Sequence, residues 1–235
     1  MSSSPAGPSA PLQRLQAVLF DMDGTLVETE ELWGEAMFAL ATQLGGTLSD
    51  EAREQTAGTS MLASMEIIYA DLGMDPAAQD LQADARWVED ETAALMTSRG
   101  MPWRPGAREL INTVRAAGLR TALVTTTPRR VATLVLDRIT AELGVDPFDV
   151  TVCGTEAGAL KPDPAPYRKA MADLGVDPRS SLVIEDSQVG TASGLAAGVA
   201  VLGIPLVQRL QPQPGLTLRT TLAGLTAADL AALLD

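Results

Sequence analysis

The sequence predicts an α/β protein in which a parallel sheet builds the core and a helical bundle is inserted into that core. Two observations lead to this prediction. From residue 102 onward, short apolar runs alternate with segments of helical periodicity, which is typical of βαβ units with right-handed crossovers. Over residues 28–99 only helical spacing occurs, without the strict alternation of a half-buried strand.

The first element is a short strand, Ala17–Phe20, that runs into acidic residues. Four apolar residues are too few for a helix and are typical of a buried strand in a parallel sheet. Asp21 and Asp23 follow directly, and Gly24 allows a tight turn. Side chains two positions apart point to the same side of an extended chain, so the two carboxylates can converge on one ligand. Their mutual repulsion requires a cation or a shared proton nearby.

The inserted bundle is predicted from three stretches of helical spacing, Leu32–Leu40, Met65–Leu72 and Asp84–Met96. Glycines and an Asp-Pro pair separate these stretches. The insert is strongly acidic, because residues 28–99 hold 15 acidic and 3 basic residues in a chain whose total net charge is −13. The predicted boundaries are a disordered tail (1–11), a core (12–27 and 101–235) and the inserted bundle (28–100).

The elements after the bundle alternate in type. In chain order they are a helix (106–117), a strand (120–124), a helix (128–143), a strand (149–153), a helix (164–174), a strand (181–184), a helix (188–197), a strand (199–202) and a last short helix (229–234). This order predicts a Rossmann-like parallel sheet. In open sheets of this kind, ligands bind beyond the carboxyl ends of the strands.

Composition narrows the class of protein. The hydrophobic content of 46% fits a folded chain with a substantial core. The negative net charge argues against nucleic acid and anionic membranes as partners. The single Cys153 permits no intrachain disulfide, and the absence of histidine excludes imidazole catalysis and histidine metal sites. With no secretory signal and no run of roughly 18 apolar residues, we expect a cytoplasmic protein, either a monomer or a weak homodimer.

Three further strand ends carry residues suited to phosphate or metal. Thr125 and Thr126 follow a strand and precede a helix, where hydroxyls and free N–H groups suit a phosphate, although an ordinary helix cap explains them as well. Lys161 is one of only two lysines and suits a phosphate beside a carboxylate. Glu185 and Asp186 directly follow an apolar strand, and hard oxygen ligands at such a strand tip favour Mg²⁺.

The run Phe20-Asp21-Met22-Asp23-Gly24-Thr25 resembles the first motif of the haloacid dehalogenase-like (HAD) superfamily of Mg-dependent phosphotransferases and phosphatases. The three later strand ends resemble the second, third and fourth motifs of that superfamily, and they occur in its order. An insert between the first and second motifs is similar to the C1-capped branch, subfamily I. That branch includes β-phosphoglucomutase-like enzymes, phosphoglycolate phosphatases and sugar phosphatases.

The resemblance implies a phosphatase that works through an aspartyl-phosphate. Asp21 would be the nucleophile, and Asp23 would protonate the leaving oxygen and later accept a proton from water. The phosphate-binding residues would be Thr125, Thr126 and Lys161, and the Mg²⁺ ligands would be Asp21, the Asp23 carbonyl, Asp186 and, directly or through water, Glu185. The resemblance also implies that the cap opens, with hinges near 27–28 and 100–104.

Two alternative functions remain open from the sequence. A β-phosphoglucomutase-like sugar phosphomutase uses a histidine and an arginine in its cap, and this chain aligns Trp33 and Met61 with those positions. Water is therefore the expected phosphoryl acceptor. A non-catalytic phosphate-binding or interaction module is the other alternative, although such relatives usually lose the nucleophile or the metal acids, and none of these acids is missing here.

Substrate choice is expected to reside in the cap. Glu28, Trp33 and Ser60 are predicted to face the leaving group, although an aromatic on the buried face of a cap helix is an equally good interpretation of Trp33. The acidic insert is explained by a solvated surface and would also disfavour polyanionic ligands. These features predict a small phosphorylated metabolite that carries one phosphate and is otherwise neutral or polar.

Overall fold

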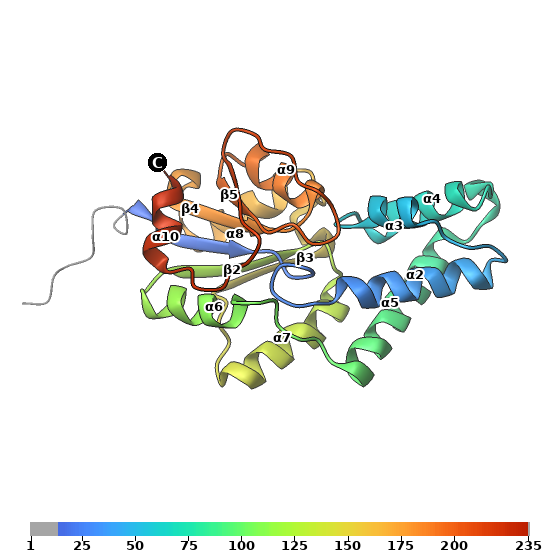
Figure 1. Cartoon of the computed structure of the whole chain (residues 1–235), viewed down its shortest axis with the longest axis horizontal. Helices are drawn as coiled ribbons and strands as arrows, with labels where there is room; N and C mark the ends of the chain where they lie inside the picture. The colour runs from blue at the N-terminus through green and yellow to red at the C-terminus, as the bar shows by residue number, and fades with distance from the viewer. Residues whose placement is uncertain (1–13, 235) are drawn as a thin grey trace, which may run out of the picture.

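The protein is described from a computed structural model, in which residues 14–234 can be described (Figure 1). The predicted disordered tail (1–11) lies outside these residues. The six strands are all parallel and are arranged in the order β3-β2-β1-β4-β5-β6. Their bounds are β1 (Ala17–Phe20), β2 (Arg120–Thr125), β3 (Val150–Cys153), β4 (Ser181–Glu185), β5 (Ala200–Gly203) and β6 (Leu216–Leu218). The predicted α/β class with a parallel sheet is confirmed.

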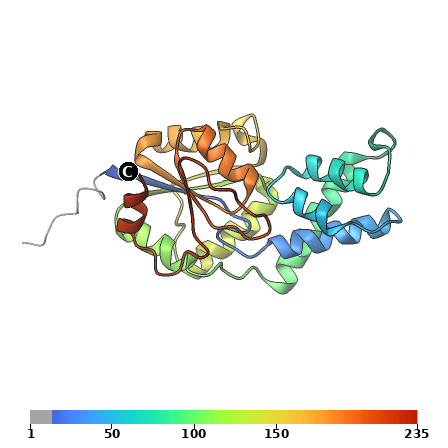
Figure 2. The same cartoon turned by 45° about the horizontal axis from the view of Figure 1, so that its top comes forward.

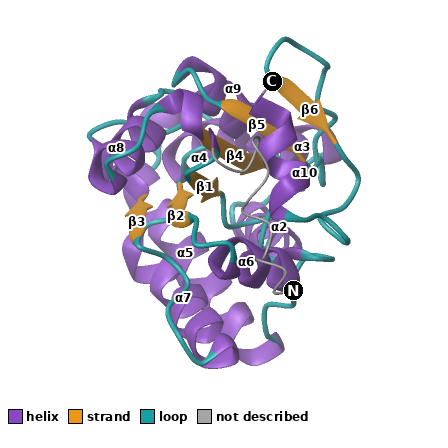
Figure 3. Ribbon diagram, turned by 90° about the vertical axis from the view of Figure 1, so that its left-hand side faces the viewer, coloured by secondary structure: helices purple, strands orange, loops and turns teal. Residues whose placement is uncertain are grey.

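The central strand β1 is buried on both faces of the sheet. Val18 and Phe20 belong to one apolar cluster, and Ala17 and Leu19 to the other, as the alternation of side chains along a strand requires. Figure 3 shows helices on both sides of the sheet. On the Phe20 side lie α6 (Ala107–Ala116), α7 (Arg129–Leu143) and α10 (Ala227–Ala231); on the other side lie α8 (Ala165–Leu174) and α9 (Gln188–Ala196).

The insert forms four helices that project from one end of the sheet, as Figures 1 and 2 show. They are α2 (Glu30–Gln43), α3 (Asp50–Thr56), α4 (Met61–Asp71) and α5 (Leu81–Arg99). The chain enters and leaves this cap along two adjacent segments, because Val27 and Trp103 form an antiparallel bridge. The Glu28 N–H donates to the Pro102 carbonyl at 2.8 Å beside that bridge. The four helices lie within the predicted range of 28–100.

Most predicted boundaries agree with the structure to within one or two residues. Two elements were not predicted, namely α3 and β6. The last predicted helix begins at Ala227 rather than at Asp229, and it ends in a 3₁₀ turn, η4 (Ala232–Leu234). The other 3₁₀ turns are η1 (Pro76–Ala78), η2 (Gly154–Ala157) and η3 (Pro178–Ser180). Within residues 14–234, every helix is too short or too polar to span a bilayer.

Candidate active site

The register of the sheet brings the acidic residues of β1 and β4 to the same level. Phe20 pairs with Ile184, so the residues that follow, Asp21 and Glu185, both lie at the carboxyl end of the sheet. The backbone N–H of Asp21 still donates to the Ile184 carbonyl at 3.0 Å. Asp21 is therefore held by the sheet itself and not by a loop, which fixes the direction of its carboxylate.

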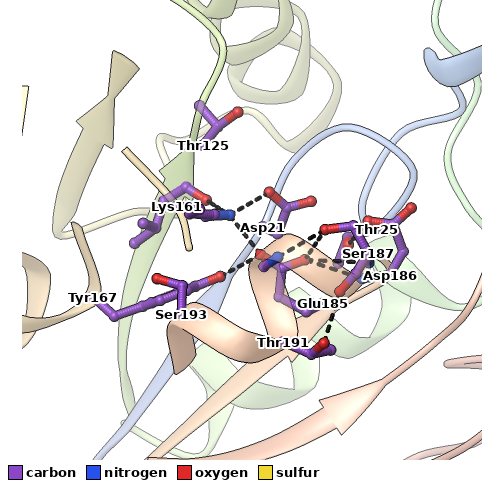
Figure 4. A network of polar contacts seen from close by, with 12 residues as sticks. Asp21, Thr25, Thr125, Lys161, Tyr167, Glu185, Asp186, Ser187, Thr191 and Ser193 are labelled. Atoms are coloured by element: carbon purple, nitrogen blue, oxygen red, sulfur yellow. Dashed lines mark hydrogen bonds and ion pairs between the residues drawn. The ribbon is translucent and has the colours of Figure 1, made fainter. Parts of the chain in front are cut away.

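Lys161 connects three of the elements at this edge (Figure 4). Its ammonium donates to Asp21 Oδ1 at 2.7 Å, to Glu185 Oε1 at 2.6 Å and to the Val124 carbonyl at 2.8 Å. These three acceptors use all three N–H groups of the ammonium. Burial disfavours the charge of Lys161, but Asp21 and Glu185 hold the pKa of the ammonium above its usual value. The lysine is a fixed cation between the two carboxylates.

Glu185 is completely buried, and both of its oxygens have donors. Oε1 accepts from Lys161 and from the Tyr167 hydroxyl, which lies 2.7 Å away. Oε2 accepts from the Ser187 hydroxyl and the Asp186 N–H, each at 3.2 Å. A Cβ on Gly190 would lie 1.9 Å from Glu185 Oε1, so a glycine is needed there. These contacts hold the Glu185 carboxylate in place, and Glu185 in turn fixes the position of the Lys161 ammonium.

Asp186 lies beside the turn that follows β1. Its Oδ1 accepts from the Thr25 hydroxyl at 3.3 Å. Gly24 has a φ of +76°, and a Cβ there would lie 2.3 Å from Asp186 Oδ2. The glycine therefore allows both the turn and the close approach of this carboxylate. Asp21, Glu185 and Asp186 each offer one oxygen, and these oxygens lie within 4.8 Å of one another.

With all three carboxyl groups ionised, the three carboxylates and one lysine would carry a net charge of −2 in a buried site. Burial raises the pKa of Asp21 to about 8; the Glu185 carboxylate acts in the same direction and Lys161 opposes it. Burial also raises the pKa of Asp186 well above its usual value, and Asp21 and Glu185 add to this. A hard divalent cation would balance this charge and suits an all-oxygen donor set. The residues present therefore fit Mg²⁺.

Asp23 is surrounded by donors and stands apart from the lysine. Its Oδ1 accepts from the Thr29 hydroxyl at 2.6 Å and from the Trp33 indole N–H at 3.1 Å. Its Oδ2 accepts from the Thr127 hydroxyl at 2.7 Å and, more weakly, from the Thr125 hydroxyl at 3.4 Å. Thr29 and Thr127 were not predicted. The run of three threonines that begins with the last residue of β2 was the only signal that could have pointed to Thr127.

These residues line a small pocket between the core and the cap, which we call the inner pocket. Its volume is about 50 Å³. From the core it is lined by Asp21, Asp23, Thr125, Thr126, Thr127, Pro128, Lys161, Asp186 and Ser187, and from the cap by Glu30, Trp33, Met37, Arg53, Thr56, Gly58, Thr59, Met61 and Ser64. The structure therefore brings together the predicted Asp21, Asp23, Thr125, Thr126, Lys161, Asp186 and Trp33 in one cavity.

Two predicted cap residues have other positions. The carboxylate of Glu28 accepts from Arg104 Nη1 at 2.7 Å, and this ion pair turns it toward the hinge and not into the inner pocket. The hydroxyl of Ser60 caps α4 by accepting from the Ala63 N–H at 3.2 Å. Ser60 lines a neighbouring cavity instead. The expectation for Glu28 is corrected on this geometry, because residue order at a hinge does not fix where a side chain points.

Arg53 is a cap residue of the inner pocket that was not predicted. Its Nη2 donates to Glu30 Oε2 at 2.8 Å and to the Glu30 carbonyl at 2.6 Å, and Nη1 donates to the Thr56 hydroxyl at 3.0 Å. Burial raises the pKa of Glu30, and Arg53 opposes that effect. The pair joins α2 to α3 and forms a neutral wall of the pocket.

The parallel sheet, the helical cap and the lysine-bridged carboxylates at the strand ends define the class of capped Rossmann-like proteins with an acidic site at the strand ends. Residues 18–204 match the family model "Haloacid dehalogenase-like hydrolase", and the chain belongs to this family. "Protein CbbY" of Rhodobacter capsulatus is 31% identical over 194 residues, covering 81% of this chain and 86% of that protein. The "Phosphorylated carbohydrates phosphatase" of Thermotoga maritima is 30% identical over 185 residues, covering 79% and 82% of the two chains.

A solved structure supports the same assignment. The crystal structure of a CbbY mutant from Rhodobacter sphaeroides, in complex with xylulose-(1,5)bisphosphate, has a TM-score of 0.79 to this chain at 29% identity. The match covers 92% of this chain and 99% of that chain, so it includes both the sheet and the cap. The predicted membership of the HAD superfamily is confirmed.

Proposed function

We propose that this chain is a Mg²⁺-dependent phosphatase that hydrolyses a small phosphomonoester, a sugar phosphate or a similar metabolite, through an aspartyl-phosphate. The observation that carries this proposal is the different surroundings of the two aspartates that follow β1. Asp21 is paired with a lysine and lies beside a second carboxylate, Asp186. The carboxylate of Asp23 accepts hydrogen bonds from hydroxyl groups and from an indole N–H. Two acids in different surroundings suit two different roles.

In the first half of the reaction, Asp21 attacks phosphorus and the ester oxygen leaves. Asp23 gives its proton to that oxygen, so the product departs as an alcohol. Lys161 holds Asp21 in line and offers positive charge to the phosphoryl oxygens. Thr125, Thr126 and the backbone N–H groups before α7 are suited to the remaining oxygens.

In the second half, Asp23 accepts a proton from water, and the resulting oxygen nucleophile attacks the phosphorus of the aspartyl-phosphate. The Asp21–phosphate bond breaks, inorganic phosphate leaves, and the two aspartates return to their starting states. Asp21, Asp186 and the Asp23 carbonyl would hold Mg²⁺. Glu185 would act indirectly, by fixing the position of Lys161. Bound Mg²⁺ supplies the positive charge that lets a phosphate dianion approach these carboxylates.

The names of the relatives support phosphorylated carbohydrates as the substrate class, and the bisphosphate in the related CbbY structure makes bisphosphates necessary members of any test panel. A phosphomutase differs from a phosphatase in the phosphoryl acceptor. Trp33 and Met61 line the inner pocket at the positions aligned with the histidine and arginine of β-phosphoglucomutase, which favours water as the acceptor.

The test is release of inorganic phosphate from p-nitrophenyl phosphate and from a panel of sugar phosphates, with and without Mg²⁺. We expect Mg²⁺-dependent turnover that is abolished by Asp21→Asn. The matched control is Asp173→Asn, the same change at an exposed aspartate that pairs with Lys169 on α8. Formation of an isomeric sugar phosphate without release of phosphate would favour the mutase. Absence of turnover on every phosphomonoester would favour a binding module.

A further inference from the structure

The inner pocket adjoins a larger cavity, which we call the side cavity. It has a volume of about 390 Å³ and lies between α4 and α5 of the cap and the loops after β2 and β3 of the core. Met61, Thr126 and Pro128 line both spaces. The inner pocket holds roughly three to four water-sized groups, judged from the volume that one water requires. A phosphoryl group fills it, and the side cavity, which shares three lining residues with it, offers room for the rest of a substrate.

The charged residues of the side cavity are paired, with one exception. Arg129 is bound to Glu156 at 2.7 Å, and Glu89 is bound to Arg130 at 2.6 Å. The remaining charged group is Arg86, on α5. Within residues 14–234 it makes no hydrogen bond or ion pair, and its side chain is exposed to the cavity. The four charged lining residues, Arg86, Arg129, Glu89 and Glu156, sum to zero, so the side cavity is neutral overall and Arg86 is its one cation without a carboxylate partner within residues 14–234.

The other two basic residues of the cap make Arg86 stand out. Arg53 is bound to Glu30 at 2.8 Å and Arg99 to Glu35, in each case by a carboxylate of α2. The insert contains 15 acidic residues, so a carboxylate partner was available for every cation. Only Arg86 is left without one among the cap's basic residues, and it is the one that lines the space beside the phosphate site. α5, which carries it, lies beside α7 of the core (Figure 1).

We propose that Arg86 binds a second acidic group of the substrate, a carboxylate or a phosphate, while the reacting phosphate occupies the inner pocket. This inference rests on the proposed phosphatase activity and names its substrate class: phosphomonoesters that carry an additional anion. A guanidinium presents a planar set of donors that matches either group with two parallel hydrogen bonds. The sequence predicted a substrate with no second charge from the overall acidity of the cap, whereas the pairing of individual residues favours the opposite.

The test compares substrates that differ only in the second acidic group. Two pairs replace a carboxylate by a CH₂OH group, 3-phosphoglycerate with glycerol 3-phosphate and 6-phosphogluconate with glucitol 6-phosphate. Glucitol 1,6-bisphosphate, added to the six-carbon pair, distinguishes a phosphate from a carboxylate. We expect kcat/KM to be at least about tenfold higher for an acidic member than for its neutral partner in one or more of these sets, which corresponds to a hydrogen-bonded charge.

Arg86→Gln is expected to reduce that preference by about tenfold or more, mainly through KM, and Arg86→Lys to restore part of it. Arg99→Gln removes a cap cation that is already paired and should leave the preference unchanged. Isothermal titration of Asp21→Asn protein, with and without Arg86→Gln, measures the same difference as binding alone.

The outcomes separate this inference from the function on which it rests. Turnover of p-nitrophenyl phosphate without a preference for any acidic substrate overturns the role of Arg86 alone. The same holds if Arg86→Gln keeps the full preference, because the arginine would then be only solvated. Failure to hydrolyse any phosphomonoester overturns the phosphatase proposal itself.

Discussion

The indole N–H of Trp33 lies 3.1 Å from Oδ1 of Asp23 and connects the cap to the acid of the core. Trp33 belongs to α2, whereas Asp23 follows β1. An indole nitrogen can only donate, so Oδ1 stays an acceptor while this bond is made. The partners of Oδ2, Thr127 and Thr125, are hydroxyls, which can donate or accept. If Asp23 carries the proton of the proposed mechanism, this geometry places that proton on Oδ2, and the Trp33 bond ties the position of Asp23 to α2 of the cap.

The first prediction concerns this bond. Trp33→Phe keeps the aromatic ring but removes the donor, and Thr29 alone then holds Oδ1 at 2.6 Å. We expect kcat to fall by roughly tenfold with little change in KM, since a hydrogen bond to a charged group is worth about 1.5–3 kcal/mol. Steady-state kinetics on p-nitrophenyl phosphate measure the change. Trp87→Phe, the same change at a partly buried tryptophan of α5 that packs against the apolar core, is the control, and an equal loss there would point to cap packing instead.

The second prediction concerns the support of Glu185. Tyr167→Phe removes a hydroxyl that donates to a completely buried carboxylate at 2.7 Å. We expect the free energy of unfolding to fall by about 1–3 kcal/mol, because a buried acceptor loses a partner that water cannot replace. Urea denaturation measures this. Tyr69→Phe is the matched control, since its hydroxyl donates at 2.6 Å to Asp84, which is partly exposed and can be rehydrated. Equal losses at the two sites would contradict the role of burial.

Most of the fold could be predicted from the sequence, because apolar runs mark the buried strands and helix breakers mark the ends of the helices. β1 was predicted at Ala17–Phe20, as the structure has it. The strand β6 escaped prediction because its three residues, Leu216–Leu218, are only partly buried and form no apolar run. The helix α3 escaped because Asp50–Thr56 buries only Ala52 and Thr56, too little for a periodic pattern.

The site was predictable where its residues lie at strand ends and not where contacts cross the fold. Asp21 and Asp186 follow apolar runs, so the sheet alone brings them together. Tyr167 reaches Glu185 from a helix in the middle of an apolar face, where nothing in the sequence distinguishes it from a core residue. Arg53 and Glu30 are 23 residues apart on different cap helices, and their pairing depends on a packing angle that spacing does not encode.

The third prediction concerns the metal. Three buried carboxylates lie together, and only Asp21 and Glu185 of these contact Lys161, so a divalent cation bound at this cluster should stabilise the folded state. Mg²⁺ at 100 times its dissociation constant should raise the free energy of unfolding by about 2.7 kcal/mol. Thermal melts with increasing MgCl₂ measure this without any substrate, with NaCl at equal ionic strength as the reference. Asp186→Asn should remove the dependence on Mg²⁺. A midpoint that responds equally to both salts would argue against a metal at this cluster.

The fourth prediction is a pH dependence that arises far from the site, at the start of α3. The N–H and hydroxyl of Ser49 both donate to the Asp71 carboxylate, each at 2.7 Å, and these two hydrogen bonds lower the pKa of Asp71 below its usual value. A carboxyl group whose pKa is lower in the folded state binds fewer protons there than in the unfolded chain. Its contribution to stability is therefore present above the unfolded pKa, near 3.9 for aspartate, and is lost as the pH falls through the folded value.

Asp71→Asn should consequently reduce the urea midpoint at pH 7 and cause a smaller reduction at about pH 3, where the wild-type group is becoming protonated. Asp75→Asn, an exposed aspartate of the same cap that accepts from the Ala77 N–H two residues away, provides the comparison for a purely local bond. A difference between wild type and Asp71→Asn that stays the same at both pH values would show that protonation of Asp71 does not change its contribution to stability. The link between α4 and the start of α3 would then depend on hydrogen bonding and not on charge.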